Sequence, residues 1–401
     1  MLTLDAIQTL ACGGLCLLAG YAIRRRVPLL LRFSIPVPVV GGLLVAMAML
    51  ACRHWHVVPV RFDTAFEQPL MIAFFTGIGF NASAALLKTG GRQILLFLAL
   101  ASALAVAQNL LGIGMARLFG LPPLFGVVTG SATLAGGPAT GLAFASLFAR
   151  AGVHGAQSVA LANAMAGIVC GSILGAPLGA LLIERLGLYP AASVSTQDAA
   201  PKPAAAVPVK PAAADPAYAG LKSLVFILLA MGIGSWISTG LGRLGMTLPG
   251  YIGAMLVGAA IRNIDDRLGW FALSADGMER IGHTCLSLFL VVALMNLHLW
   301  DLAGLALPLL ANLAVQSVLV VAFCRWPLLR LMGGDYDAAV MASGFAGFML
   351  GTTANAVAGM SSLAERFGPA RRAFLVAPVV GAFLIDFANA IVITGFVNGW
   401  R

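Results

Sequence analysis

Long runs of apolar residues, separated by short polar breaks, make up most of this chain. An α-helix needs about 20 apolar residues to cross the ~30 Å hydrocarbon layer of a membrane, and the runs approach that length. Uninterrupted runs predict ten transmembrane helices, at about 5–23, 36–52, 69–87, 94–118, 157–183, 221–240, 248–262, 283–300, 302–324 and 372–397. The pattern therefore predicts an all-α polytopic membrane protein.

Two further stretches, about 122–148 and 336–362, are apolar but broken by glycine. Their centres read GSATLAGGPATG (130–141) and ASGFAGFMLGTTANAVAGM (342–360). Irregular backbone at membrane depth is tolerated only against protein or a water-filled cavity, because its N–H and C=O groups need partners. We expect both stretches to be re-entrant and to line a binding site. Small-residue faces for helix packing are the alternative interpretation.

Composition excludes several classes of protein. The chain is 60% hydrophobic and 10% charged, whereas soluble chains average about 25% charged residues. The net charge of +9 comes from Lys and Arg at the ends of the runs rather than in one patch, which argues against nucleic-acid binding. No His/Asp or Cys/His constellation points to an enzyme, and the six cysteines lie in or beside apolar runs without a CxxC pattern.

The chain divides into two similar halves. Residues 189–219 are rich in Pro and Ala and predict a flexible linker between an N-terminal unit, 1–188, and a C-terminal unit, 220–401. IPVPVVGGLLVAMA (35–48) resembles TLPGYIGAMLVGAA (247–260), and similar offsets relate Asn81 to Asn296, Gln108 to Gln316 and Gly137 to Gly351. We interpret the halves as a duplicated membrane unit.

The distribution of Lys and Arg predicts the topology. If both broken stretches are re-entrant and the N-terminus is outside, few cations lie outside: Arg53, Arg61, Arg117, Arg150, Arg243 and Arg401. If both stretches crossed the membrane, the cations would divide almost evenly, so the positive-inside rule favours re-entrant loops. Each half then holds five spans, and the second half is inverted. Inverted repeats with broken helices are typical of secondary transporters. Both termini are expected on the periplasmic side and the linker in the cytoplasm.

Polar residues of the broken stretches are the candidate substrate site. Helix N-termini that begin inside the membrane suit a carboxylate, because they present free N–H groups and a positive dipole end. Free carbonyls and hydroxyls suit Na⁺ or an ammonium group. The candidate substrate-binding residues are Ser131, Thr133, Gly136, Gly137, Thr140, Gly351, Thr352, Thr353 and Asn355.

Of the 15 Asp and Glu residues, Asp386 alone stands in the middle of a predicted span. An intramembrane carboxylate is costly and is by default a functional candidate. Asn389 follows one turn later on the same helix face. We expect a cation site, for Na⁺ or a substrate amino group, near Asp386, with Asn389, Asn81 and Asn109 as further candidates. A protonated structural Asp, and amides that only bridge helices, are the alternatives.

Several motifs resemble the bacterial sodium/glutamate symporter family along nearly the whole chain. They include FEQPLMIAFFTGIGFNAS (66–83), QNLLGIGMA (108–116), GSATLAGGPATG (130–141), TCLSLFLVVALM (284–295), YDAAVMASGFAGFMLGTTANAVAGM (336–360) and ERFGPARRAFLVAPVVGAFLIDFANAIVI (365–393). The resemblance implies Na⁺-coupled uptake of L-glutamate across the bacterial inner membrane, ten spans, two re-entrant loops, a large central cytoplasmic loop and a homodimer. It implies no cofactor beyond Na⁺ as the coupling ion.

The chain departs from the family pattern in both loops. The first family loop typically reads Gly-Gly-His-Gly-Thr-Gly, whereas this chain has Pro138 and Ala139 in the third and fourth positions. The second typically reads Gly-Ala-Thr-Pro-Thr-Ala, and here Ala354 stands in place of the proline. Three hypotheses follow: an Na⁺/glutamate symporter working by alternating access, a symporter with another coupling ion or organic anion, and an ion channel whose re-entrant loops form a filter. An intramembrane enzyme would need paired catalytic groups, and Asp386 stands alone.

Overall fold

The computed structural model describes residues 2–55, 60–190, 216–243, 249–302 and 304–400. Most of the linker predicted at 189–219 lies outside these ranges. The first helix after the linker already begins at Pro216.

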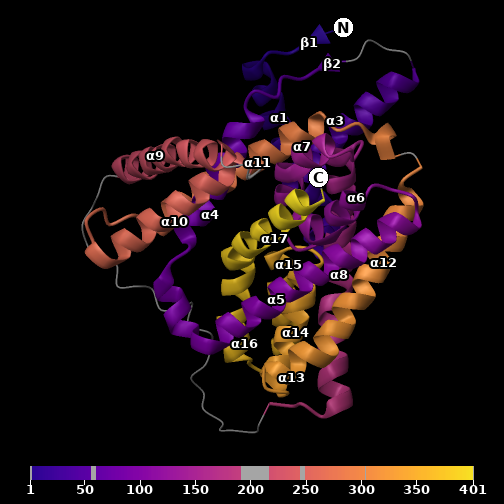
Figure 1. Ribbon diagram of the computed structural model, residues 1–401, viewed down its shortest axis with the longest axis vertical. Helices are drawn as coiled ribbons and strands as arrows, with labels where there is room; N and C mark the ends of the chain where they lie inside the picture. The colour runs from indigo at the N-terminus through magenta and orange to yellow at the C-terminus, as the bar shows by residue number, and fades with distance from the viewer. Residues whose placement is uncertain (1, 56–59, 191–215, 244–248, 303, 401) are drawn as a thin grey trace.

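The described chain is almost entirely helical (Figure 1). The N-terminal half contains β1 Leu2–Thr3, α1 Ala6–Arg26, α2 Pro28–Arg32, α3 Val37–His54, β2 Val60–Arg61, α4 Glu67–Asn81, α5 Ala84–Leu118, α6 Pro123–Val127, η1 Val128–Ala132, α7 Gly137–Arg150 and α8 Ala156–Leu186. The C-terminal half contains α9 Pro216–Arg243, α10 Gly250–Leu268, α11 Ala275–Met295, η2 Leu299–Leu302, α12 Ala306–Phe323, η3 Cys324–Leu328, α13 Leu329–Leu331, α14 Tyr336–Met349, α15 Thr353–Phe367, α16 Arg371–Val379, η4 Val380–Leu384 and α17 Ile385–Gly399.

Eight stretches of helix are long and apolar enough to cross a membrane among the described residues: those of α1, α3, α5, α8, α9, α11, α12–α13 and α16–α17. Two predicted spans, 69–87 and 248–262, are also helical, as α4 and α10, but do not meet that criterion. At 15 residues α4 is only about 22 Å long. In α10 the apolar part is followed by Arg262, Asp265, Asp266 and Arg267. The chain is thus a multi-pass, all-helical membrane protein.

The helices form two groups (Figure 1). In the first group, α4 packs along α10 and α11, α10 packs along α9, and α1 packs along α3 and α11. The second group contains α5, both broken segments, α8, α12 and the C-terminal helices, with α14 packed along α8 and α15. The groups meet where Phe144 of α7 stands edge-on to Tyr251 of α10. Tyr251 in turn stacks on Phe75 of α4, with ring centroids 3.9 Å apart.

A glycine stripe on α8 brings that helix close to the second broken segment. Glycines recur at every fourth position, at 167, 171, 175 and 179. A Cβ atom on Gly167 would lie 2.5 Å from the carbonyl oxygen of Leu350, and one on Gly171 would lie 3.0 Å from that of Gly347. Small residues at a spacing of four allow such an approach between helices. Some glycines of the apolar runs therefore serve packing, in addition to those that break the helices.

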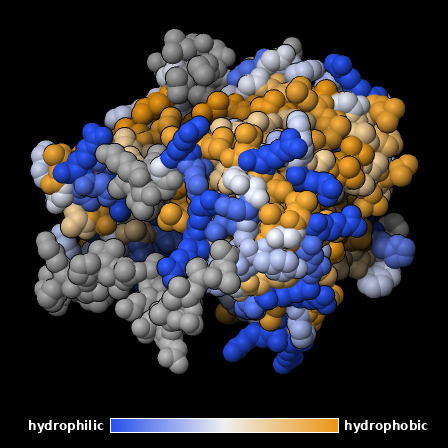
Figure 2. All heavy atoms as spheres, turned by 90° about the horizontal axis from the view of Figure 1, so that it is seen from below, coloured by the Kyte–Doolittle hydropathy of each residue, from blue (hydrophilic) through white to orange (hydrophobic). Residues whose placement is uncertain are grey.

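The surface follows the membrane expectation. Figure 2 looks at the molecule from below Figure 1 and shows hydrophilic residues gathered across this end, bordered by hydrophobic ones. Large apolar side chains are exposed along α9, including Leu228, Trp236 and Ile237, and along α1, including Leu15 and Leu18. Exposed apolar faces of this kind suit contact with lipid.

Candidate functional site

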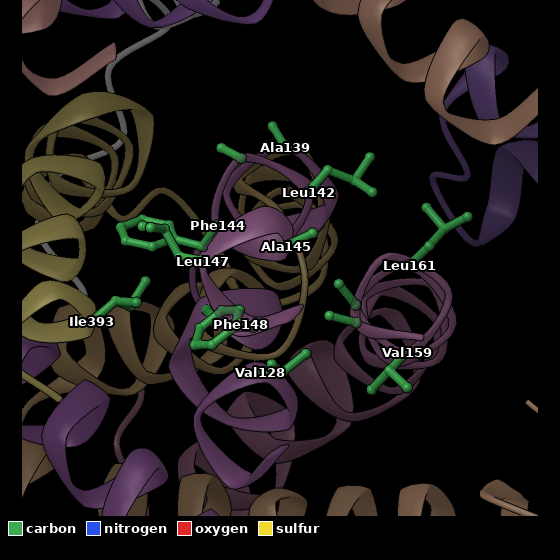
Figure 3. Packing of buried hydrophobic residues seen from close by; sticks show 14 of the residues in the cluster. Val128, Ala139, Leu142, Phe144, Ala145, Leu147, Phe148, Val159, Leu161 and Ile393 are labelled. Atoms are coloured by element: carbon green, nitrogen blue, oxygen red, sulfur yellow. The ribbon is translucent and has the colours of Figure 1, made fainter. Parts of the chain in front are cut away.

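The first broken segment consists of α6, η1 and α7. Gly130 leaves helical geometry at φ −99° and ψ −130°, within η1. Gly137 then adopts φ +65°, which favours glycine, and the chain continues into α7 with Pro138 in its first turn. Proline is well suited there, because the first N–H groups of a helix have no intrahelical partner. α7 itself is well packed: in Figure 3 it lies between Val159 and Leu161 of α8 and Ile393 of α17.

The second broken segment consists of α14 and α15. α14 ends at Met349, and Thr352 caps α15 by accepting a hydrogen bond from the backbone N–H of Asn355 at 3.4 Å. The hydroxyl of Thr353 donates to the carbonyl of Gly381 in η4 at 2.5 Å. This bond ties the start of α15 to the helical break that precedes Asp386.

The tips of the two segments meet at one cavity. A Cβ atom on Gly137 would lie 3.7 Å from the carbonyl oxygen of Gly351, so the two backbones are almost in contact. Beside them lies a cavity of about 1130 Å³. Its wall contains both tips, 135–139 and 351–354, together with Phe383 and Asp386 from the second helix group. α1, α3, α4, α10 and α11 of the first group close the other side.

Charged residues lie at the part of the cavity formed by the first helix group. Arg262 pairs with Asp266 at 2.9 Å, and His283 lies 3.6 Å from Glu279. Arg24 also lines the cavity, and its buried Nε has no hydrogen-bond partner. Arg24 and Arg262 are the Lys or Arg residues among the described residues of the cavity wall, and both belong to the first helix group; the tips themselves contribute helix N-termini as positive groups.

The structure brings together seven of the predicted site residues on the cavity wall: Gly136, Gly137, Gly351, Thr352, Thr353, Asn81 and Asp386. The remaining six do not line it: Ser131, Thr133, Thr140, Asn355, Asn109 and Asn389. All six are at most 3% exposed and lie within the second helix group, behind the tips. Polar side chains of the broken motifs therefore occupy two distinct layers.

The inner layer satisfies the backbone at the breaks. Asn109 accepts from the N–H of Ser131 at 2.9 Å, and Asn389 donates to the carbonyl of Ser131 at 2.9 Å. Asn163 donates to Thr133 and to the carbonyl of Thr129, which also accepts from Asn312 at 2.8 Å. These bonds provide the partners that interrupted helices need inside a membrane.

The second segment is held in the same way, partly by the other half of the chain. Gln108 donates to the carbonyl of Met349 at 3.0 Å, and Asn355 donates to that of Ile168 at 2.9 Å. Gln316 donates to the carbonyl of Gln108 at 2.7 Å. The two glutamines that the repeat pattern aligned are thus direct neighbours in space.

Several cavity residues were not predicted from the sequence. Arg24 looked like one of three topogenic arginines after the first span, and Phe383, Phe348 and Ser287 looked like ordinary residues of apolar helices. The sequence feature that these residues share is their position near a helix break or near the end of a span, and this feature alone would not have identified them as cavity residues. The described residues contain no group of three or more His, Cys, Asp or Glu suited to a metal ion.

Comparison with known proteins identifies the family. The model of the sodium/glutamate symporter family matches residues 2–369. This chain belongs to the sodium/glutamate symporter family. It is similar to the sodium/glutamate symporter of Escherichia coli (strain K12), at 39% identity over 98% of this chain and 97% of that protein.

Two further relatives carry the same description. The sodium/glutamate symporter of Shigella flexneri is 39% identical over the same shares of both chains. That of Haemophilus influenzae is 35% identical over 97% of this chain and 96% of the relative. The likeness thus extends past residue 369 and includes the C-terminal helix that carries Asp386. The family is one of transporters, which agrees with a multi-pass membrane protein whose helix breaks meet at a cavity.

Proposed function

We propose that this protein is a secondary active symporter that imports glutamate, or a closely related acidic amino acid or dicarboxylate, together with Na⁺ across the bacterial inner membrane. The observation that carries the proposal is the meeting of two helix N-termini, those of α7 and α15, at one cavity that also contains Asp386. Membership of the sodium/glutamate symporter family supports both the substrate and the coupling ion.

The two N-termini fit a substrate with two carboxylates. The first turn of each helix presents N–H groups without intrahelical partners, together with the positive end of the helix dipole. One carboxylate would bind at Gly136, Gly137 and the start of α7, and the other at Gly351, Thr352, Thr353 and the start of α15. Pro138 supplies no N–H, so α7 offers one donor fewer than α15 in this turn.

Asp386 would bind the positive partner of the substrate. Asp386 lines the same cavity as the two tips, together with Asn81. A carboxylate there can hold either the α-ammonium group of an amino acid or a coupling Na⁺. An acidic substrate and its cation would thus be bound by groups of opposite charge on the same wall of one pocket, the wall formed by the second helix group.

The membrane topology forms part of the proposal. We propose ten spans, with α4 and α10 as the shortest, two re-entrant segments, an inverted relation between 1–188 and 220–401, and both termini in the periplasm. The corresponding places of Asn81 and Asn296 at the ends of α4 and α11 support the repeat. The polar end seen in Figure 2 would then face the cytoplasm. The exposed apolar faces of α1 and α9 are compatible with lipid and with a homodimer contact.

Alternating access would move the two helix groups relative to each other. The cavity lies between them, and on another side the groups meet at Phe144 and Tyr251. The hydrogen bonds of the Asn and Gln side chains described above join both broken segments to α5, α8, α12 and α17. The second group can therefore move as one body with the substrate.

The coupling has an energetic requirement. Each net positive charge carried inward gains ~2.3 kcal/mol per 100 mV of membrane potential. A substrate of charge −1 therefore needs at least two accompanying cations before the potential assists uptake.

Uptake into liposomes tests the proposal. Purified protein in liposomes should accumulate labelled glutamate when an inward Na⁺ gradient is imposed, and not with choline in place of Na⁺. Accumulation that follows a proton gradient alone would reassign the coupling ion. Current that depends on neither gradient nor saturable substrate would indicate the ion-channel alternative. Competition by a panel of acidic amino acids and dicarboxylates would identify the substrate that the Pro138 departure favours.

A further inference from the structure

Several buried oxygens around η1 have no hydrogen-bond partner. Asn163 and Asn312 both donate to the carbonyl of Thr129, and Asn389 donates to that of Ser131. In all three amides the side-chain oxygen is buried without a hydrogen-bond partner, and so is the hydroxyl of Ser131. These four residues are at most 2% exposed. The amide N–H groups of these three residues donate to protein oxygens at the break, and their own oxygens are left over. The Nδ2 of Asn109, whose oxygen accepts from the N–H of Ser131, is also buried without a partner.

These acceptors belong to residues that surround the same helix break. The two residues whose carbonyls receive the amides, Thr129 and Ser131, are separated by the single residue Gly130. The oxygen and nitrogen of an amide are attached to the same carbon, so each unpartnered amide oxygen lies within one amide group of the carbonyl that its own nitrogen binds, and the Ser131 hydroxyl belongs to one of the two residues that carry these carbonyls. The four side chains come from η1, α8, α12 and α17, and these three helices all pack against η1.

An unpartnered buried acceptor costs roughly 1–3 kcal/mol, and most buried polar atoms in proteins have a partner. Four such acceptors around one helix break therefore favour a ligand at that break. A single water molecule has two protons and would satisfy two of the four acceptors, whereas a bare cation can be shared by all of them. The only carboxylate within one turn on the same helix is that of Asp386, three residues before Asn389. Neutral oxygens with one nearby negative charge suit a monovalent cation better than Ca²⁺ or Mg²⁺, which favour several carboxylates.

We propose that the hydroxyl of Ser131 and the side-chain oxygens of Asn163, Asn312 and Asn389 form a dry Na⁺ site behind the first tip, separate from the carboxyl of Asp386 in the cavity. Asn109 is not a ligand in this arrangement, because its oxygen already accepts from the N–H of Ser131. It is a positioning residue that holds η1. The site rests on the Na⁺ coupling proposed above and assigns where one of the ions binds.

The site offers a direct route to coupling. The carbonyl of Ser131 accepts hydrogen bonds from the N–H groups of Ala135 and Gly136, at 3.2 and 3.0 Å, as well as from Asn389. A cation that fixes Ser131 would therefore also fix the tip that meets the substrate. Linkage is reciprocal, so Na⁺ should increase the affinity for substrate and substrate should increase the affinity for Na⁺ by the same factor.

The test uses Ser131→Ala on the full chain. The Ser131 hydroxyl makes no hydrogen bond in the structure, so its removal leaves the packing intact. Ser343→Ala is the matched control, because Ser343 is also fully buried, with an unpartnered hydroxyl, in α14 of the second segment. Two quantities are measured: the Na⁺ concentration that half-saturates uptake in liposomes, and the rise of Tm of the detergent-solubilised protein with NaCl, at ionic strength held constant with choline chloride and without glutamate.

The Ser131→Ala variant should need roughly 10–100-fold more Na⁺ in both measurements, by analogy with losses at other metal sites. The Ser343→Ala control should keep the wild-type Na⁺ response. Ser131→Cys, which retains a side chain of similar size but offers soft sulphur to a hard cation, should behave like the alanine variant. The half-saturating glutamate concentration of Ser131→Ala should also lose part of its dependence on Na⁺.

Wild-type Na⁺ dependence of Ser131→Ala in both measurements would overturn the site and leave the proposed symport intact. A higher Tm of Ser131→Ala without Na⁺, with no change in the Na⁺ response, would overturn it too, since this is the result expected for an unsatisfied structural hydroxyl. Wild-type protein that takes up glutamate without regard to Na⁺ would contradict the proposed function instead. A Ser131-dependent rise of Tm with Na⁺ would still support the site in that case.

Discussion

Gly137 is the position at which backbone strain should translate directly into a loss of substrate affinity. It stands at the tip of the first broken segment, lines the cavity and has φ +65°. A residue with a Cβ atom pays roughly 1–2 kcal/mol in this left-handed region. A Cβ atom would meet its nearest neighbour, the carbonyl oxygen of Gly351, at an ordinary 3.7 Å, so strain and not a clash is the perturbation.

The Gly137→Ala variant can relieve this strain only by moving the tip. If the full 1–2 kcal/mol is lost from the bound state, affinity for glutamate should fall by roughly 5–30-fold. Initial rates of Na⁺-driven uptake into liposomes, measured over a range of glutamate concentrations, report the half-saturating concentration.

Gly120→Ala is the matched control. Gly120 has nearly the same backbone angle, φ +67°, but its Cβ would meet nothing within 4 Å, and it lies outside the cavity wall. Both variants should lose similar thermal stability, because the strain is the same. Only Gly137→Ala should raise the half-saturating glutamate concentration. Equal concentrations in the two variants would refute the placement of the first tip at the substrate.

Four other changes test the remaining parts of the structure. Asp386→Asn removes the negative charge from the cavity and should weaken the Na⁺ dependence of uptake or the preference for amino acids over dicarboxylates; unchanged kinetics for both would make Asp386 structural. Thr352→Ala removes the cap of α15 and should cost about 1 kcal/mol of stability, together with substrate affinity, whereas Thr352→Ser, which keeps the hydroxyl, should retain both. Gly171→Ala should lower Tm by forcing α8 and α14 apart, because a Cβ atom there would lie 3.0 Å from the carbonyl oxygen of Gly347. Gly114→Ala is the control and should leave Tm unchanged, because a Cβ atom on Gly114 would meet nothing within 4 Å. Asp265 lies beyond the apolar part of α10, where burial raises the pKa of its carboxyl, but hydrogen bonds from the N–H groups of Leu273, Phe271 and Ala272 outweigh burial and hold that pKa below its usual value. The resulting stability is present above the unfolded pKa of about 3.9 and is lost as pH falls through the lower folded pKa. Asp265→Asn should therefore lower Tm at pH 7 and match the wild type in strong acid, and a difference in Tm that did not vary with pH would contradict this origin.

Much of the architecture could be predicted from the order of apolar and polar residues. Every predicted span contains a helix, because a run of apolar residues in a membrane must satisfy its own backbone hydrogen bonds. The breaks at 130–137 and 350–352 were also predictable, since glycine clusters interrupt such runs. Boundaries were less accurate: α11 ends at Met295, before the predicted end at 300, with Asn296 as its C-cap. The 15-residue length of α4 was not predicted either.

The order of residues along the chain is therefore enough to predict the class of protein, the places where its helices break and, through its motifs, its family. Which polar residues of the broken motifs face the cavity depends on how the helices pack. Thr352 and Thr353 line it, whereas Ser131 and Asn389, which are also polar, are fully buried behind the tips. Residue type alone does not tell whether a buried polar side chain binds a ligand or hydrogen-bonds to the backbone of an interrupted helix. Only the packing of helices distant in sequence determines which hydrogen-bonding groups remain available to a solute.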